Sequence, residues 1–303
     1  MLRNAGRFAY ERFSAWMNHE VEPPDRHMSD LDRAALCLKP GDVILVEGRS
    51  RIASVIKTVT QSCWTHVALY VGRVQDHKDP EIIKVLTTHC PHHDNQPLLL
   101  EAELGSGTLV TTLNKYQDYH VRICRPTTLT VRDRDAVLLH TLNRVGLEYD
   151  IRLLFDLARW VFPICLFPRR WGSCLFDKEN RRGKTHTICS TLIAEAFYAV
   201  EFPIRPEVSG TQAGNPQLEM QDPRLCTPKD FDVSPYFDIL KFPLLQLATA
   251  GGYHQLPWTT LAASQAEATT SIPVTAWIQN TLQRRYLWLR QWAKFLIKLP
   301  ANR

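Results

Sequence analysis

Among the eight cysteines of the chain, Cys189 has the sequence context that best suits a nucleophile. A polar, basic loop at 181–186 precedes it, and helix-forming residues with apolar side chains at helical spacing follow it. A cysteine in the first turn of a helix lies near unpaired backbone N–H groups and the positive end of the helix dipole, and both favour the thiolate. The alternative is that Cys189 is a small buried residue at a helix start, and the residues alone leave the two interpretations evenly balanced.

A thiolate nucleophile needs a base and a group that orients the base. His66 begins a predicted strand at 66–72, and Glu101 ends an apolar run inside a predicted strand at 98–102. If the two strands are neighbours, the carboxylate holds one imidazole nitrogen and the other nitrogen is free to take the thiol proton. The alternatives are a structural histidine and a solvent-facing carboxylate, and Glu103 is a rival for the orienting role.

Other polar residues are weaker candidates for a metal site or for the wall of an active site. The run His-Cys-Pro-His-His-Asp at 89–94 contains metal-ligand residue types, but it lies in the polar segment 73–97, a predicted surface insertion, and its proline breaks the ligand geometry. His186, three residues before Cys189, is a candidate for lining the site. The sequence contains no CxxC pair and no glycine-rich phosphate loop, so we expect no metal and no cofactor.

The sequence predicts both helices and strands as the elements that position these residues. A short helix at 29–36 is expected to begin at Ser29 with Asp32 as its capping-box partner, and Gly105-Ser106-Gly107 is expected to form a hairpin turn. Clustered strands followed by helices predict the α+β class. Helices are expected at 2–18, 29–36, 50–59, 131–145 and 188–200, and strands at 43–46, 66–72, 98–102, 109–113 and 121–125.

Composition narrows the class of protein. The 303 residues are 45% hydrophobic and 22% charged, which excludes disorder throughout the chain. No stretch approaches the ~20 apolar residues of a membrane-spanning helix, and no secretory signal opens the sequence. The cysteines are scattered through a large chain, so we expect free thiols and a cytoplasmic location.

The C-terminal segment is expected to contact a membrane surface. Residues 268–303 contain six basic residues and no acidic one. Within 277–299, apolar residues recur at helical spacing together with three tryptophans, which is typical of a basic helix that lies in the headgroup plane of anionic lipid. The alternative is a helix packed on the domain. The expected location is therefore cytoplasmic with peripheral membrane association, and no nucleic-acid partner is expected.

Five ordered motifs resemble the permuted NlpC-type papain-like cysteine hydrolases, and the YiiX-like branch is the most similar. A further segment, Cys226-Thr227-Pro228-Lys229-Asp230 with Ser234, resembles the end of that domain, and the resemblance covers residues 36–240. The five motifs are Leu38-Lys39-Pro40-Gly41-Asp42-Val43-Ile44-Leu45, Thr65-His66-Val67-Ala68-Leu69-Tyr70-Val71-Gly72, Leu100-Glu101-Ala102, Gly146-Leu147-Glu148-Tyr149-Asp150 and Ile188-Cys189-Ser190-Thr191-Leu192-Ile193-Ala194-Glu195-Ala196.

The resemblance implies an α+β, papain-like fold in which a small antiparallel sheet packs on the cysteine helix, here with added terminal amphipathic helices. It gives Cys189 the nucleophile role, His66 the base role and Glu101 the orienting role, with Tyr149 lining the substrate pocket. The predicted domains are an N-terminal helical segment at 1–35, a catalytic domain at 36–245, a linker at 246–272 and the basic, aromatic helix at 273–303.

The expected function is a cysteine-dependent hydrolase or acyltransferase that cleaves an ester or amide through an acyl-enzyme. Because the C-terminal helix suits a membrane, a lipid or lipid-linked substrate is favoured. One alternative is a peptidoglycan or peptide amidase, that is, a cysteine peptidase. Another is a non-catalytic lipid-binding module that retains the fold.

Overall fold

The computed structural model describes residues 12, 14–20, 28–90, 95–147, 189–209, 217–246, 252, 254 and 256. The chain divides into two compact units, one of residues 10–244 and one that combines residues 1–9 with 245–303. All the helices and strands named below lie in the first unit. No helix within the described ranges is long and apolar enough to cross a membrane.

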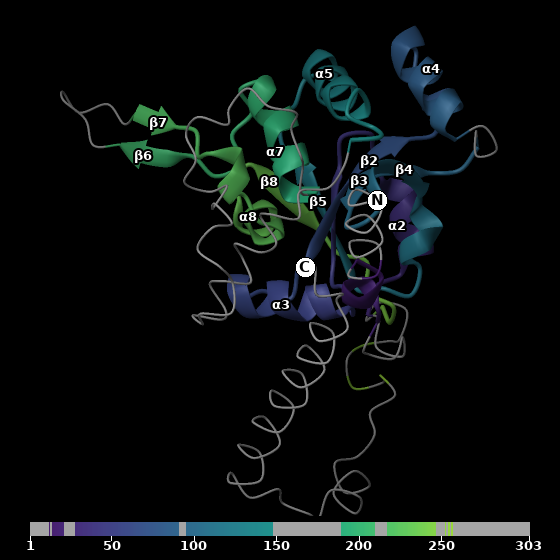
Figure 1. Cartoon of the computed structure of the whole chain (residues 1–303), viewed down its shortest axis with the longest axis vertical. Helices are drawn as coiled ribbons and strands as arrows, with labels where there is room; N and C mark the ends of the chain where they lie inside the picture. Colours follow the sequence, from purple (N-terminus) through teal and green to yellow (C-terminus); the bar gives the residue numbers. More distant parts are fainter. Residues whose placement is uncertain are drawn as a thin grey trace, which may run out of the picture. The chain divides into compact units, whose positions relative to one another are not determined.

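A six-stranded antiparallel sheet forms the centre of the first unit, in the order β4-β3-β2-β1-β5-β8 (Figure 1). Short, mostly buried apolar runs form its central strands, as expected for a sheet covered on both faces. The strands are β1 (Val43–Val46), β2 (His66–Gly72), β3 (Leu98–Glu103), β4 (Gly107–Thr112), β5 (Val121–Pro126) and β8 (Phe237–Leu240).

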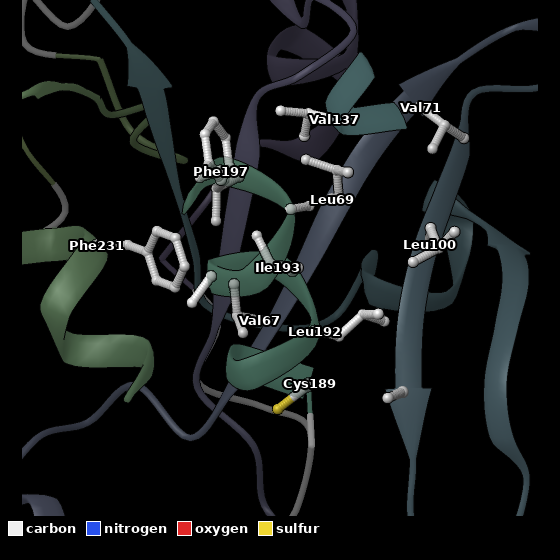
Figure 2. Packing of buried hydrophobic residues seen from close by; sticks show 14 of the residues in the cluster. Val67, Leu69, Val71, Leu100, Val137, Cys189, Leu192, Ile193, Phe197 and Phe231 are labelled. Atoms are coloured by element: carbon white, nitrogen blue, oxygen red, sulfur yellow. The ribbon is translucent and has the colours of Figure 1, made fainter. Parts of the chain in front are cut away.

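One face of the sheet packs against the helix that begins at Cys189. This helix, α7 (Cys189–Ala199), buries Leu192, Ile193 and Phe197 completely. Figure 2 shows these side chains among Val67 and other residues of the sheet, with Cys189 at the start of the helix. Burying a side chain of this size contributes about 1.5–3 kcal/mol, so the packing fixes α7 on β2 and β3. Helices α5 (Val131–Leu142) and α8 (Pro228–Val233) add to the same cluster.

A smaller cluster covers the other face of the sheet. Helix α2 (Leu31–Cys37) contributes Leu31 and Ala34, and the 3-10 turn η2 (Leu113–Tyr116) contributes Leu113 and Tyr116. Because strand side chains alternate between faces, His66 and Glu101 belong to this face together with Ala68, Tyr70 and Leu99.

The remaining elements lie around the sheet. Helix α3 (Arg51–Thr60) follows β1 and begins at the N-cap Ser50, whose side chain accepts a hydrogen bond from the backbone N–H of Ala53. The others are the 3-10 turns η1 (Val74–Asp76) and η4 (Pro223–Leu225), helix α4 (Pro80–His89), and the two-stranded hairpin β6 (Glu207–Ser209) and β7 (Gln217–Glu219), which projects away from the sheet (Figure 1).

Two local predictions are wrong. The segment 73–97 is not a surface insertion throughout, because α4 buries Ile82 and Leu86 in the main core. The helical spacing of the apolar residues in α4 was hard to recognise because charged residues and prolines stand among and around them. Helix α2 is capped by Asp30, which accepts from the backbone N–H of Arg33. Ser29 instead bonds His120 and the backbone of β5.

The mixed α and antiparallel β class predicted from the sequence is confirmed. The strands predicted at 43–46 and 66–72 form over those residues, and the other predicted elements of this unit form with shifts of a few residues at their ends. Arg12 and residues 14–18 are helical. The rest of the N-terminal helix predicted over 2–18 and the helix predicted over 273–299 lie outside the described residues.

Candidate active site

The register of the sheet brings His66 and Glu101 together. β2 and β3 are antiparallel with Leu69 opposite Leu100, so the next pair places Glu101 opposite Ala68 and diagonal to His66. Diagonal neighbours on one sheet face are within reach of long side chains. The Nε2 atom of His66 lies 2.6 Å from Oε2 of Glu101.

Glu101 is a completely buried carboxylate with three hydrogen-bond partners. It bonds the His66 ring, the ammonium of Lys115 and the hydroxyl of Tyr116. Turn η2 carries the last two residues back over the second face of the sheet. Burial alone would raise the pKa of Glu101, but the hydrogen bonds and charges of His66 and Lys115 lower that pKa to about 2. Glu101 is therefore ionised at neutral pH.

Cys189 is the first residue of α7 and is 4% exposed. The packing of α7 on the sheet holds it in place, and the Ser190 hydroxyl anchors the first helical turn to the backbone oxygen of Cys226 at 2.6 Å. The position at the helix start agrees with the sequence prediction. At this end of a helix, backbone N–H groups lack helical partners and are available to a negative charge.

A hydrogen bond joins Cys189 to the His66 side chain, which is thus shared between the thiol and Glu101. Since Glu101 occupies Nε2, Nδ1 is the ring nitrogen left for Cys189. Burial alone would lower the pKa of His66, but the interactions with Cys189 and Glu101 raise it to about 10. The imidazole of His66 can therefore carry a positive charge at neutral pH while it bonds the Cys189 side chain.

A cleft of about 210 Å³ opens on these groups. His66 and Cys189 line it, and α3, the turn at 48–50 and the 102–104 segment supply much of the remaining wall. Asn18 and Glu20 of the N-terminal segment also line the cleft. The described wall takes no residue from 73–97.

The structure separates the predicted site residues into three groups. Cys189, His66 and Glu101 come together, whereas Glu103 bonds Lys115. Tyr149 and His186, predicted to line the substrate pocket, lie outside the described residues.

Lys115 and Tyr116 were missed by the sequence reasoning. The available signal was the burial of Glu101, because a buried carboxylate needs hydrogen-bond donors, and the hairpin brings the residues after β4 back toward β3. The partners of Glu101 supplied by η2 could have been sought on that ground.

The other cysteines have different surroundings. Cys37 and Cys63 are exposed, and all six described cysteines are free. Cys90, which the sequence placed in an exposed insertion, is buried in the main core because α4 packs there, and burial raises its pKa. Within the described ranges, no three His, Cys, Asp or Glu side chains are grouped so that they could hold a metal ion.

A helix with a cysteine at its start, packed on an antiparallel sheet that carries a histidine–carboxylate pair, defines the class of papain-like cysteine hydrolases. Comparison with protein families agrees: residues 37–159 match the family described as permuted papain-like amidase enzyme, YaeF/YiiX, C92 family. This part of the chain is similar to that family, and the match supports an enzyme of the papain-like amidase and cysteine hydrolase class. The matched range contains His66 and Glu101 and ends before Cys189.

Among solved structures, the chain is similar to the crystal structure of the metalloprotein yiiX from Escherichia coli O157:H7. The two share 13% sequence identity, over 67% of this chain and 97% of that chain, with a TM-score of 0.41. No curated protein sequence matches the chain.

Proposed function

We propose that Cys189, His66 and Glu101 form the catalytic triad of a thiol hydrolase that cleaves an amide or ester bond. The observation that carries the proposal is the shared imidazole, which contacts the buried carboxylate at 2.6 Å and bonds the only described cysteine that lines the cleft. The order of histidine before cysteine in the chain agrees with a permuted, NlpC-type arrangement.

In the first step, Sγ of Cys189 attacks the substrate carbonyl carbon and a C–S bond forms. The carbonyl electrons move to oxygen, where backbone N–H groups at the start of α7 are the proposed oxyanion donors. His66 gives its proton to the leaving amine or alcohol as the C–N or C–O bond breaks, and an acyl-enzyme remains. Glu101 keeps the imidazole oriented and balances its positive charge.

In the second step, neutral His66 takes a proton from a water molecule, and the resulting hydroxide attacks the acyl carbon. The C–S bond breaks, Cys189 leaves as the thiolate, and a carboxylic acid is released. If an alcohol or amine replaces water, the same steps transfer the acyl group. The active site therefore supports hydrolysis and acyl transfer by one chemistry.

We further propose that the substrate is a lipid or is linked to a lipid. This part of the proposal rests on the sequence of residues 273–303, which lie outside the described residues. A basic helix rich in tryptophan would hold the enzyme at an anionic membrane surface, where lipid esters and amides are abundant. The competing substrate class is a soluble peptide amide.

Two series of substrates test the proposal. We would measure kcat/KM with aminomethylcoumarin amides of single amino acids and with p-nitrophenyl esters of short and long fatty acids. Cys189→Ala and His66→Ala should each lower kcat/KM by at least about 10³-fold, whereas Cys63→Ala, which removes an exposed thiol, should leave it unchanged. Full activity in Cys189→Ala would refute the triad, and a preference for amides over long-chain esters would favour the peptide alternative.

A further inference from the structure

Arg49 lies in the same cleft as Cys189 and His66, and the described residues satisfy only part of its guanidinium. The Arg49 side chain is 12% exposed. Its Nη1 donates to the backbone oxygen of Asp118 at 3.1 Å, and its Cζ lies 4.0 Å from the centroid of the Tyr119 ring. Its Nε atom is buried and has no hydrogen-bond partner among the described residues. The guanidinium is thus held in place with donor capacity to spare.

The carboxylate beside Arg49 is loosely placed. Oε2 of Glu20 lies 3.9 Å from Nη2 of Arg49, which is longer than a hydrogen bond. The Glu20 side chain is 45% exposed, and its other oxygen accepts from the Tyr119 hydroxyl. An ion pair with this geometry is weak, so another anion can replace Glu20 beside Arg49. Among the described residues, Lys115 is the other lysine or arginine that lines the cleft, and it already bonds Glu101 and Glu103.

The backbone places Arg49 near the reacting groups. Val46 is directly opposite His66 in the sheet, and Arg49 follows Val46 by three residues. The backbone N–H of Gly48 donates to Oγ1 of Thr65 at 2.9 Å, which ties the turn before Arg49 to the residue before His66. Because the cleft measures only about 210 Å³, below the roughly 300–1,000 Å³ of drug-sized pockets, a group bound to Arg49 lies close to the thiol.

We propose that Arg49 binds a carboxylate or phosphate group of the substrate, close to the carbonyl that Cys189 attacks. This inference rests on the proposed function, because it assigns the cleft beside Cys189 to the substrate. A guanidinium binds either anion through two parallel N–H groups. Arg49 therefore selects acidic amides or esters over neutral ones, and Glu20 marks the place that the substrate anion takes.

Alkylation of Cys189 tests the inference without a known substrate. Iodoacetate and iodoacetamide have nearly the same size and differ in that one carries a carboxylate and the other a neutral amide. Peptide mass spectrometry would give the rate at Cys189 for each reagent, with exposed Cys63 in the same protein as the internal reference. If Arg49 binds the carboxylate, Arg49→Gln should lower the iodoacetate-to-iodoacetamide rate ratio at Cys189 by about 10–100-fold.

Two control variants distinguish anion binding by Arg49 from a change in the structure and from the loss of any positive charge near the site. Lys57→Gln removes a positive charge from α3, where Lys57 pairs with Glu47 and does not line the cleft, so the rate ratio should not change. Arg49→Lys keeps the positive charge but lacks the two parallel N–H groups of a guanidinium. It should therefore retain only part of the wild-type rate ratio. An unchanged ratio in a folded Arg49→Gln protein, checked by thermal melting, overturns the inference. Failure of both reagents to label Cys189 ahead of Cys63 overturns the proposed function as well.

Competition identifies the anion. N-acetylglutamate and glycerol 3-phosphate would be compared with the neutral N-acetylglutamine and glycerol for protection of Cys189 from iodoacetamide. Protection by either anion in the wild type, lost in Arg49→Gln, supports the inference, and the stronger of the two names a carboxylate or a phosphate substrate. Protection by an anion that is equal in wild type and Arg49→Gln contradicts it.

Discussion

Replacing Glu101 with glutamine removes one negative charge from the centre of the active site and changes little else in shape. The wild-type carboxylate is completely buried and bonds His66, Lys115 and Tyr116. A glutamine side chain has one acceptor oxygen in place of two, and its NH₂ group meets groups that are themselves donors. Glu103→Gln is the matched control, because Glu103 also bonds Lys115 but does not bond His66.

The expected size of the effect follows from burial. Removing one partner of a buried ion pair costs about 3–5 kcal/mol. In a unit of this size each kcal/mol shifts Tm by about 2–4 °C, so the melting temperature should fall by roughly 6–20 °C. The loss of an oriented general acid–base group should lower kcat/KM by about 10²–10⁴-fold. Glu103 is partly exposed, and its replacement should lower Tm by only a few degrees.

Differential scanning calorimetry and esterase kinetics would measure both effects, with p-nitrophenyl acetate as the substrate. A third observable is the pKa of His66, from NMR titration of its ring protons. Glu101 contributes to raising that pKa, so Glu101→Gln should lower it. Equal losses of activity in Glu101→Gln and Glu103→Gln, or an unchanged His66 pKa, would refute the orienting role of Glu101.

Four further outcomes are expected. At mildly acidic pH, Cys189 should react with iodoacetamide before the exposed Cys37 and Cys63, and His66→Ala should slow that reaction; equal labelling of the three thiols would contradict the thiolate argument. Because the folded-state pKa of His66 is raised to about 10, its contacts stabilise the fold fully below the ordinary histidine pKa of about 6.5 and lose that effect as pH rises toward 10. Urea unfolding at pH 6 and pH 9 should therefore show a larger loss of stability in wild type than in Glu101→Gln, and an equal loss would speak against the interaction. Tyr116→Phe should destabilise the fold by about 1–3 kcal/mol in calorimetry while retaining most activity, and a drop in activity as large as that of Glu101→Gln would show that Tyr116 does more than support the carboxylate. Deleting residues 273–303 should leave turnover of soluble esters intact but abolish flotation with anionic liposomes, through a loss of up to about 1 kcal/mol per basic residue near the surface; aggregation of the truncated protein instead would indicate a packed helix.

The sequence was most informative where the hydrophobic pattern was continuous. The strand at 66–72 and the helix after Cys189 are apolar runs bounded by polar residues, and both form as predicted. Pattern also located Glu101, because a carboxylate inside a buried strand requires a partner. Which residue is that partner depends on the order and register of strands, and these are set by tertiary packing rather than by local sequence.

Short and interrupted elements could not be predicted in the same way. Helix α4 carries Ile82 and Leu86 among charged residues and begins with a proline, so its composition resembled that of a loop. Strand β8 covers four residues and pairs with β5, more than 100 positions earlier in the chain. Arg49 gave no signal, because its importance comes from the contacts with Tyr119 and the cleft, and neither is encoded by neighbours in sequence.

The most direct test of the account is to trap the acyl-enzyme. Protein mixed with p-nitrophenyl acetate and quenched in acid within seconds would be analysed by intact mass and then by peptide mapping. The account predicts an adduct of one acetyl group per chain on Cys189, formed in a burst and absent in Cys189→Ala and His66→Ala. An adduct on another residue, or steady turnover of the ester by Cys189→Ala, would contradict the assignment of Cys189 as the nucleophile.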